Sequence, residues 1–146
     1  MTEATTTPSS LTIGIDLGDR KSHVCVLDAD GAVVEESRIA TTPKALRSRF
    51  ESLAPTRIAL EVGGHSAWVC ELLKELGHEV LVANARKLRM IFQSDSKTDR
   101  LDAEQLARVA RLDPKLLYPI EHRKRSARAD LAVMRSRDAL VTTRTR

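Results

Sequence analysis

The chain has 146 residues, 42% of them hydrophobic and 30% charged, which is typical of a single soluble globular domain with one core. No run approaches the roughly 18 to 20 apolar residues of a membrane span, and the start MTEATTTPSS lacks the basic and apolar regions of a signal peptide. We therefore expect a cytoplasmic protein without a membrane segment, and its net charge of +4 suits an anionic partner.

The first part of the chain predicts three strands and a helix. After residues 1–10, which we expect to be disordered, LTIGIDL alternates apolar and small or polar residues as a strand does, and SHVCVLD follows a short turn. The sequence DADG at Asp28 to Gly31 predicts a hairpin turn into a third strand, AVVEESRIA. Pro43 then opens an amphipathic helix, KALRSRFESLA, that ends before Pro55.

The second part alternates strands and helices. RIALEVGG predicts a fourth strand, SAWVCELLKELG a helix ended by Gly77, and HEVLVAN a fifth strand. A short helix, ARKLRMIF, and a loop, SDSKTD, precede a helix from Thr98 or Asp99 to about Leu112, and a basic helical segment follows a proline-bracketed connector. This order of elements is that of an RNase H-like α/β domain, with a mixed five-stranded sheet and helices on both faces.

Two carboxylates occupy strand positions where a buried charge is costly unless it is paired or binds a cation. Asp16 lies in the first strand and Glu61 near the end of the fourth, and these strands are adjacent in an RNase H-like sheet. Each acid alone is more often a structural carboxylate. Together, with Gly18, Gly63 and Gly64 leaving open space nearby, they indicate a site.

Two more acids, Asp99 and Asp102, stand three residues apart in SKTDRLDAEQLARVARLD, on one face of the predicted helix. A structural explanation is available, because acids favour the start of a helix and Ser96 with Asp99 would make a loose capping pair. In the RNase H-like topology, however, this helix packs so that both acids approach Asp16 and Glu61. Four carboxylates repel one another unless cations neutralise them, and oxygen ligands favour Mg²⁺ or Mn²⁺. We therefore expect a divalent-metal site for phosphoryl transfer on nucleic acid.

Three stretches, GIDLGDRKSHVCVLD, LEVGG and above all KTDRLDA, resemble the N-terminal domain of the DEDD transposases of bacterial insertion sequences, which have a RuvC-like fold. The likeness runs from Leu11 through nearly the whole chain. It implies that the family's catalytic and metal-binding acids fall on Asp16, Glu61, Asp99 and Asp102. It also implies a Mg²⁺-dependent DNA recombinase for transposition that, in several members, uses a structured non-coding RNA as a guide.

Members of this family carry a second, C-terminal domain with a serine thought to be the nucleophile, joined by a long helical segment. This chain ends inside what looks like the start of that segment, so we expect a fragment that is incomplete for activity. Its RuvC-like catalytic domain is expected over residues 11–113, with a linker and the start of a coiled-coil-like segment over 114–146, through which we expect a homo-oligomer. The nucleophilic role is assigned to none of the serines Ser22, Ser48, Ser66, Ser94 and Ser126.

Basic residues around the acidic loop and in the tail are the expected contacts to nucleic acid. Residues 120–146 hold eight Lys or Arg against three acids, although such a run by itself is more often a solvated helix face. The candidates are Arg86, Lys87, Arg89, Lys97, Arg100, Arg123, Lys124, Arg125 and Arg128.

The histidines and cysteines show no metal-ligand spacing. His23, His65, His78 and His122 are therefore expected to be structural or exposed, with His65 beside the presumed site. The two cysteines, Cys25 and Cys70, are expected to be reduced core residues.

Three other functions remain open. GIDLGDRKS also fits the phosphate-binding hairpin of an actin-like ATPase or sugar kinase, but that fold needs a second phosphate loop and an adenosine-binding segment, for which this chain is too short. A non-catalytic module could hold a structural ion among the acids and dock RNA or a partner helix on its basic tail. A RuvC-type junction resolvase is close in chemistry, but KTDRLDA argues against it.

Overall fold

The computed structural model describes residues 10–84, 86–88 and 101–122, which form one mixed sheet with helices on both faces. The strands are β1 (Thr12–Asp16), β2 (Lys21–Leu27), β3 (Val33–Ala40), β4 (Arg57–Glu61) and β5 (Glu79–Ala83). The helices are α1 (Pro43–Phe50), α2 (Ser66–Glu75) and α4 (Ala103–Leu112), followed by the 3₁₀ helix η1 (Pro114–Leu117). Within the described part of the chain, no helix is long and apolar enough to cross a membrane.

The sheet has the strand order β3-β2-β1-β4-β5. Strand β2 is antiparallel to both β1 and β3, whereas β4 is parallel to β1 and β5 is parallel to β4. A three-stranded meander is thus extended by two parallel strands, which is the RNase H-like arrangement that the order of elements predicted. The predicted basic C-terminal helix falls on residues 123–146, outside the described residues.

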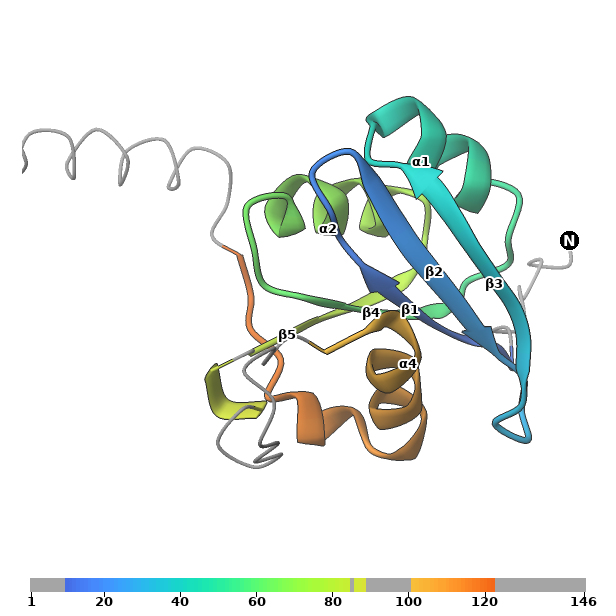
Figure 1. Cartoon of the computed structure of the whole chain (residues 1–146), viewed down its shortest axis with the longest axis vertical. Helices are drawn as coiled ribbons and strands as arrows, with labels where there is room; N and C mark the ends of the chain where they lie inside the picture. The colour runs from blue at the N-terminus through green and yellow to red at the C-terminus, as the bar shows by residue number, and fades with distance from the viewer. Residues whose placement is uncertain (1–9, 85, 89–100, 123–146) are drawn as a thin grey trace, which may run out of the picture.

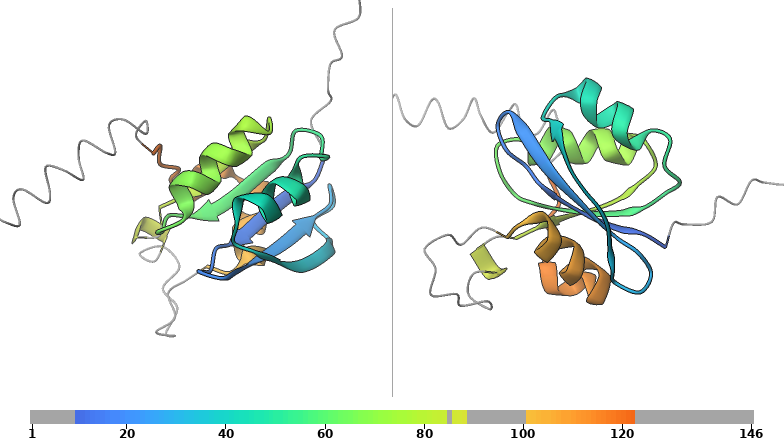
Figure 2. Two further views of the ribbon diagram at one scale, coloured as in Figure 1. Left: turned by 90° about the horizontal axis from the view of Figure 1, so that it is seen from above. Right: turned by 45° about the vertical axis from the view of Figure 1, so that its right-hand side comes forward.

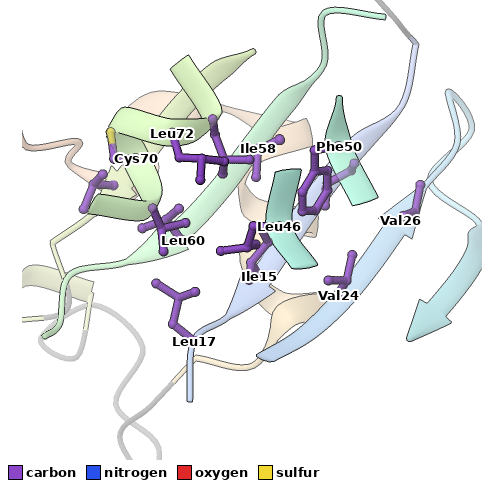
Figure 3. Packing of buried hydrophobic residues seen from close by; sticks show 14 residues of the cluster. Ile15, Leu17, Val24, Val26, Leu46, Phe50, Ile58, Leu60, Cys70 and Leu72 are labelled. Carbon is purple, nitrogen blue, oxygen red and sulfur yellow. The ribbon is translucent and has the colours of Figure 1, made fainter. Parts of the chain in front are cut away.

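The helices α1 and α2 cover one face of the sheet and α4 covers the other (Figure 1; Figure 2). On the first face Ile15 of β1 and Leu60 of β4 pack with Leu46 and Phe50 of α1 and Leu72 of α2 (Figure 3). These side chains are all buried and belong to the largest apolar cluster of the described residues. Burying them supplies the main driving force for folding.

On the second face, small side chains at the start of α4 let the helix come close to β1 and β2. Ala103 and Ala107 of α4 pack against Cys25 and Leu27 of β2. Between them, at Gly14 of β1, an added Cβ would lie 1.9 Å from the backbone oxygen of Ala103 and 2.8 Å from the backbone nitrogen of Ala107. The first turn of α4 therefore rests directly on the backbone of β1, and only glycine permits this approach.

Two predicted helix boundaries differ from the structure. Helix α1 begins at Pro43 and ends before Pro55 as predicted, but its last residue is Phe50 and not Ala54. Helix α4 begins at Ala103, not at Thr98 or Asp99, because Asp102 has an extended backbone and caps the helix from outside.

Substituting Gly14 tests the close approach of α4. In Gly14→Ala the new methyl group meets backbone atoms, which cannot rotate away as a side chain can, so the helix must shift. Overpacking of this kind costs about 1–3 kcal/mol, and urea unfolding of the full chain should show a loss at the upper end of that range.

Gly63→Ala is the matched control, because no atom lies within 4 Å of a Cβ built there. Its stability should change by no more than about 0.5 kcal/mol. Equal losses in the two variants would contradict the special role of Gly14.

Candidate functional site

Asp16 and Glu61 lie side by side at the carboxyl ends of two neighbouring parallel strands. Ile15 of β1 is paired with Leu60 of β4, so the two acids are the next residue on each strand. Glu61 stands opposite Ala83 of β5, whose side chain packs on the α4 face. Adjacent strands are about 4.8 Å apart, and side chains alternate between the faces of a sheet, so both acids belong to the α4 face. The pairing of these two acids is what the sequence predicted.

Asp102 reaches the same end of the sheet from α4. The helix runs antiparallel to β1: its start lies over Gly14, and Ala110 near its end accepts a hydrogen bond from Arg57 at the start of β4. Asp102 therefore precedes the helix on the side where β1 and β4 end.

The carboxylate of Asp102 also has a structural role. Its Oδ1 accepts a hydrogen bond of 2.7 Å from the backbone N–H of Gln105, and the backbone N–H of Asp102 donates to Gln105 Oε1 at 3.0 Å. This reciprocal pair is a capping box, and it holds the start of α4. Asp102 followed three residues later by Gln105 is a sequence signal for such a capping box. The capping pair expected from the sequence was instead Ser96 with Asp99.

The fourth acid, Asp99, lies outside the described residues, as do the basic candidates Arg89, Lys97, Arg100, Arg123, Lys124, Arg125 and Arg128. Within the described ranges, no three His, Cys, Asp or Glu side chains are grouped closely enough to hold a metal ion. The structure thus brings Asp16 and Glu61 together and directs Asp102 toward them, without a closed set of ligands among these residues.

A histidine joins the loops that follow the two acid-bearing strands. Trp68 Nε1 donates to His65 Nδ1 at 3.1 Å, so the ring proton is on Nε2, which lies 3.2 Å from Asp19 Oδ1. Asp19 belongs to the turn after Asp16, and His65 stands just before α2, a few residues after Glu61. The contact fixes the two loops relative to each other. The expectation that His65 lies beside the site agrees with this position.

His78 has a structural position and His23 an exposed one. His78 is buried, accepts a hydrogen bond from the backbone N–H of Thr56 at 3.1 Å and donates to the backbone oxygen of Phe50 at 2.9 Å. It ties the end of α1 to the start of β4. His23 is exposed on β2, where its Nε2 accepts a hydrogen bond from Arg38 Nε.

Two cavities share a wall beside the acids. The larger, of about 520 Å³, lies between the start of α4 and the β2–β3 edge, and Asp102 and Glu104 are among its lining residues. The smaller, of about 270 Å³, is lined by Asp16, Gly18, Lys21, His23 and Arg38. His23 and Arg38 line both cavities, so the two cavities are neighbours, one at the start of α4 and one at Asp16.

Of the predicted basic contacts, Arg86 and Lys87 are described, and both are exposed in the segment that follows β5. Lys87 Nζ lies 4.9 Å from the centre of the Tyr118 ring, a cation–π distance. Both residues follow the carboxyl end of a strand parallel to β4, and so lie at the same end of the sheet as Glu61. Neither one lines the cavities beside Asp16.

A family comparison decides the class of protein. The family model described as a transposase, of the DEDD type named for IS110, matches residues 13–146. The chain belongs to this transposase family. The resemblance inferred from KTDRLDA is therefore confirmed, whereas no curated protein is significantly similar to the chain in sequence.

Solved structures with some likeness to this transposase-family chain come from two functional groups. RuvC of T. thermophilus in complex with a Holliday junction is 15% identical with a TM-score of 0.43, over 82% of this chain and 86% of RuvC. The polyphosphate/ATP-glucomannokinase of Arthrobacter sp. strain KM is 22% identical with a TM-score of 0.38, over 62% and 51% of the two chains. A ROK-family glucokinase of Streptomyces griseus is 18% identical with a TM-score of 0.34, over 60% and 38%. All three TM-scores are low, so none of these likenesses decides the function.

Two substitutions of Asp102 distinguish the stability that comes from its capping hydrogen bond from the stability that comes from its negative charge. Asp102→Ala removes the hydrogen bond to Gln105 and should cost about 1 kcal/mol of stability in urea unfolding without divalent metal. Asp102→Asn keeps a capping oxygen and should cost only a few tenths of a kcal/mol. Equal losses in both variants would mean that the charge, and not the cap, stabilises α4.

The cysteines are free and buried as predicted, and Cys25 supplies a dependence on pH. Burial, followed by the negative charges of Glu36 and Glu104, raises the pKa of the Cys25 thiol above its ordinary value of 9.0. The native thiol thus keeps its proton at pH values where the unfolded chain has lost it. Its contribution to stability is complete below the ordinary value and is lost as the pH rises through the native pKa.

In urea unfolding, the transposase domain should therefore lose stability more steeply above pH 9.0 than its Cys25→Ala variant. The quantity compared is the slope of the unfolding free energy against pH. Titrating groups common to both proteins contribute equally to this slope, and the packing lost with the sulfur does not depend on pH. Identical slopes would contradict the raised pKa.

Proposed function

We propose that this chain is the RuvC-like domain of a DNA transposase, in which acids at the carboxyl ends of β1 and β4 serve the cleavage and exchange of DNA strands. The observation that carries the proposal is the adjacent placement of Asp16 and Glu61 in a chain of the transposase family. Asp102, at the start of α4, is proposed as the third acid of the site. Asp99 is proposed as the fourth because it matches the motif of the family.

The donor set fits Mg²⁺ or Mn²⁺ better than zinc, because it consists of carboxylate oxygens without a thiolate or a clustered imidazole. Asp16, Glu61, Asp99 and Asp102 would hold the ions. When bound, divalent ions of this kind activate the attacking oxygen and stabilise the leaving oxygen of a phosphodiester.

The chain's own residues supply the positioning. Gly14 lets the start of α4 rest on β1, which sets how near Asp102 comes to Asp16. Because Oδ1 of Asp102 accepts from the helix backbone, its second oxygen is the one left to face a cation. The contact between His65 and Asp19 keeps the loops after Asp16 and Glu61 in one arrangement.

A non-catalytic module is the second candidate, because Asp102 has a structural role as the cap of α4. In that case a bound ion would be structural. DNA is the proposed substrate of the first candidate. A guide RNA and a homo-oligomer through the C-terminal helical segment of residues 114–146 stay predictions.

A thermal shift with Mg²⁺ or Mn²⁺ tests the metal site. An ion that binds only the native state, at about 100 times its Kd, stabilises it by about 2.7 kcal/mol, or about 10 °C for a domain of this size. Asp16→Asn should remove most of this shift. Asp30→Asn, an exposed acid in the hairpin at the far end of β2, should keep it. An equal shift in wild type and Asp16→Asn would contradict the site.

The same proteins distinguish the two candidates through DNA binding. An ion at a catalytic site contacts the phosphate, so Mg²⁺ should strengthen DNA binding by wild type and by Asp30→Asn but not by Asp16→Asn. A structural ion would raise the melting temperature without changing the DNA affinity. That result would favour the non-catalytic module.

A further inference from the structure

The face of the sheet beside Asp16 carries a row of side chains that the sequence analysis did not select. The register places Asp16 of β1 opposite His23 of β2, and His23 opposite Arg38 of β3. Residues directly opposite each other share a face, so these three groups form one line across the sheet. Lys21, two residues from His23 on β2, belongs to the same face. We refer to Lys21, His23 and Arg38 as the basic ledge.

The basic ledge is open because α4 covers only part of its face. The helix starts over Gly14 and packs on Cys25 and Leu27, which leaves the end of β2 near Asp16 uncovered by any described helix. All three ledge residues are exposed, and all three line the cavity of about 270 Å³ that also contains Asp16. A ligand in this cavity would touch the ledge and the acid together.

Arg38 is oriented but not neutralised. Its Nε donates to His23 Nε2, which fixes the plane of the guanidinium and leaves both Nη groups available. Within the described part of the chain, neither Arg38 nor Lys21 is in an ion pair. By contrast, the arginines that face a carboxylate elsewhere are Arg47, Arg49, Arg57 and Arg108.

The chemistry of the ledge is that of phosphate recognition. A guanidinium with both Nη groups free can bind a phosphate in a bidentate manner through that edge, and an ammonium adds a point charge beside it. The acids of the larger cavity, Glu36 and Glu104, would repel a phosphate. A phosphate is thus expected at the smaller cavity, beside Lys21, Arg38 and Asp16.

We infer that the basic ledge binds the backbone of the DNA strand that is cut, next to the scissile phosphate. This inference rests on the proposed function, because it takes Asp16 as the acid beside the reacting group. Arg38 stands two strands from Asp16, so their backbones are about 10 Å apart, and the two residues line the same cavity. Lys21 and Arg38 contact the phosphates, and His23 is a positioning residue that orients Arg38.

The test measures the binding of labelled duplex DNA, and of RNA of the same sequence, to the full chain at several salt concentrations. Removal of two phosphate contacts in Lys21→Gln/Arg38→Gln should weaken DNA binding at low salt at least about tenfold, and should lower the slope of log K against log salt by about 1.8. Both positions are exposed, so the urea midpoint should not change, which verifies that the variant folds.

Lys44→Gln/Lys74→Gln is the matched control, because it removes the same charge from exposed positions of α1 and α2 on the opposite face. Its DNA binding should stay close to that of wild type. Equal weakening in both double variants would overturn the ledge, since net charge alone would then explain the effect. Weakening confined to RNA would also overturn it.

The metal-induced thermal shift keeps this inference distinct from the proposed function. The ledge variant should keep the full shift with Mg²⁺ or Mn²⁺, because none of its altered groups is a proposed ligand. Loss of the shift in this variant would mean that the ledge acts on the metal site, which overturns the inference. If wild type shows no shift while the ledge variant alone loses DNA affinity, the metal site fails and the ledge stands.

Discussion

The contact between the first turn of α4 and the backbone of β1 determines the geometry of the candidate site. It exists because position 14 is glycine, where any side chain would overlap the backbone oxygen of Ala103. The small residues Ala103 and Ala107 extend the same close approach onto β2. A helix held at ordinary packing distance would carry Asp102 away from the end of β1.

The parallel pair of strands supplies the second constraint. Parallel strands end at the same edge of a sheet, so acids at the ends of β1 and β4 must be neighbours once the register is set. That register is fixed by the burial of Ile15 and Leu60 on the opposite face, because a slip of β4 by one residue would turn Leu60 away from this core and Glu61 into it. The apolar core under α1 and α2 therefore positions charged groups on the other face of the sheet.

The charges around the site are divided between two cavities. The larger is lined by the acids Glu36, Asp102 and Glu104, whereas Lys21 and Arg38 line the smaller one beside Asp16. Lys21 and Arg38 come from the antiparallel strands β2 and β3. In an enzyme that cuts a nucleic acid, this division allows a strand to approach the acids without crossing a negatively charged surface.

Local patterns in the sequence determined much of this protein. Alternation, turn residues and Pro43 gave the order of the elements, and that order gave the sheet and the adjacency of Asp16 and Glu61. The stretch KTDRLDA indicated the transposase family, and the match of the family model to residues 13–146 confirmed it. Tertiary structure alone decided the rest, because the deciding contacts join residues far apart in the chain. The cap at Asp102 determines where α4 starts, and Gly14 determines how closely α4 approaches the sheet. The register of three strands determines the row from Asp16 to Arg38. No local periodicity encodes a register between strands, so the basic ledge could not be found from the sequence.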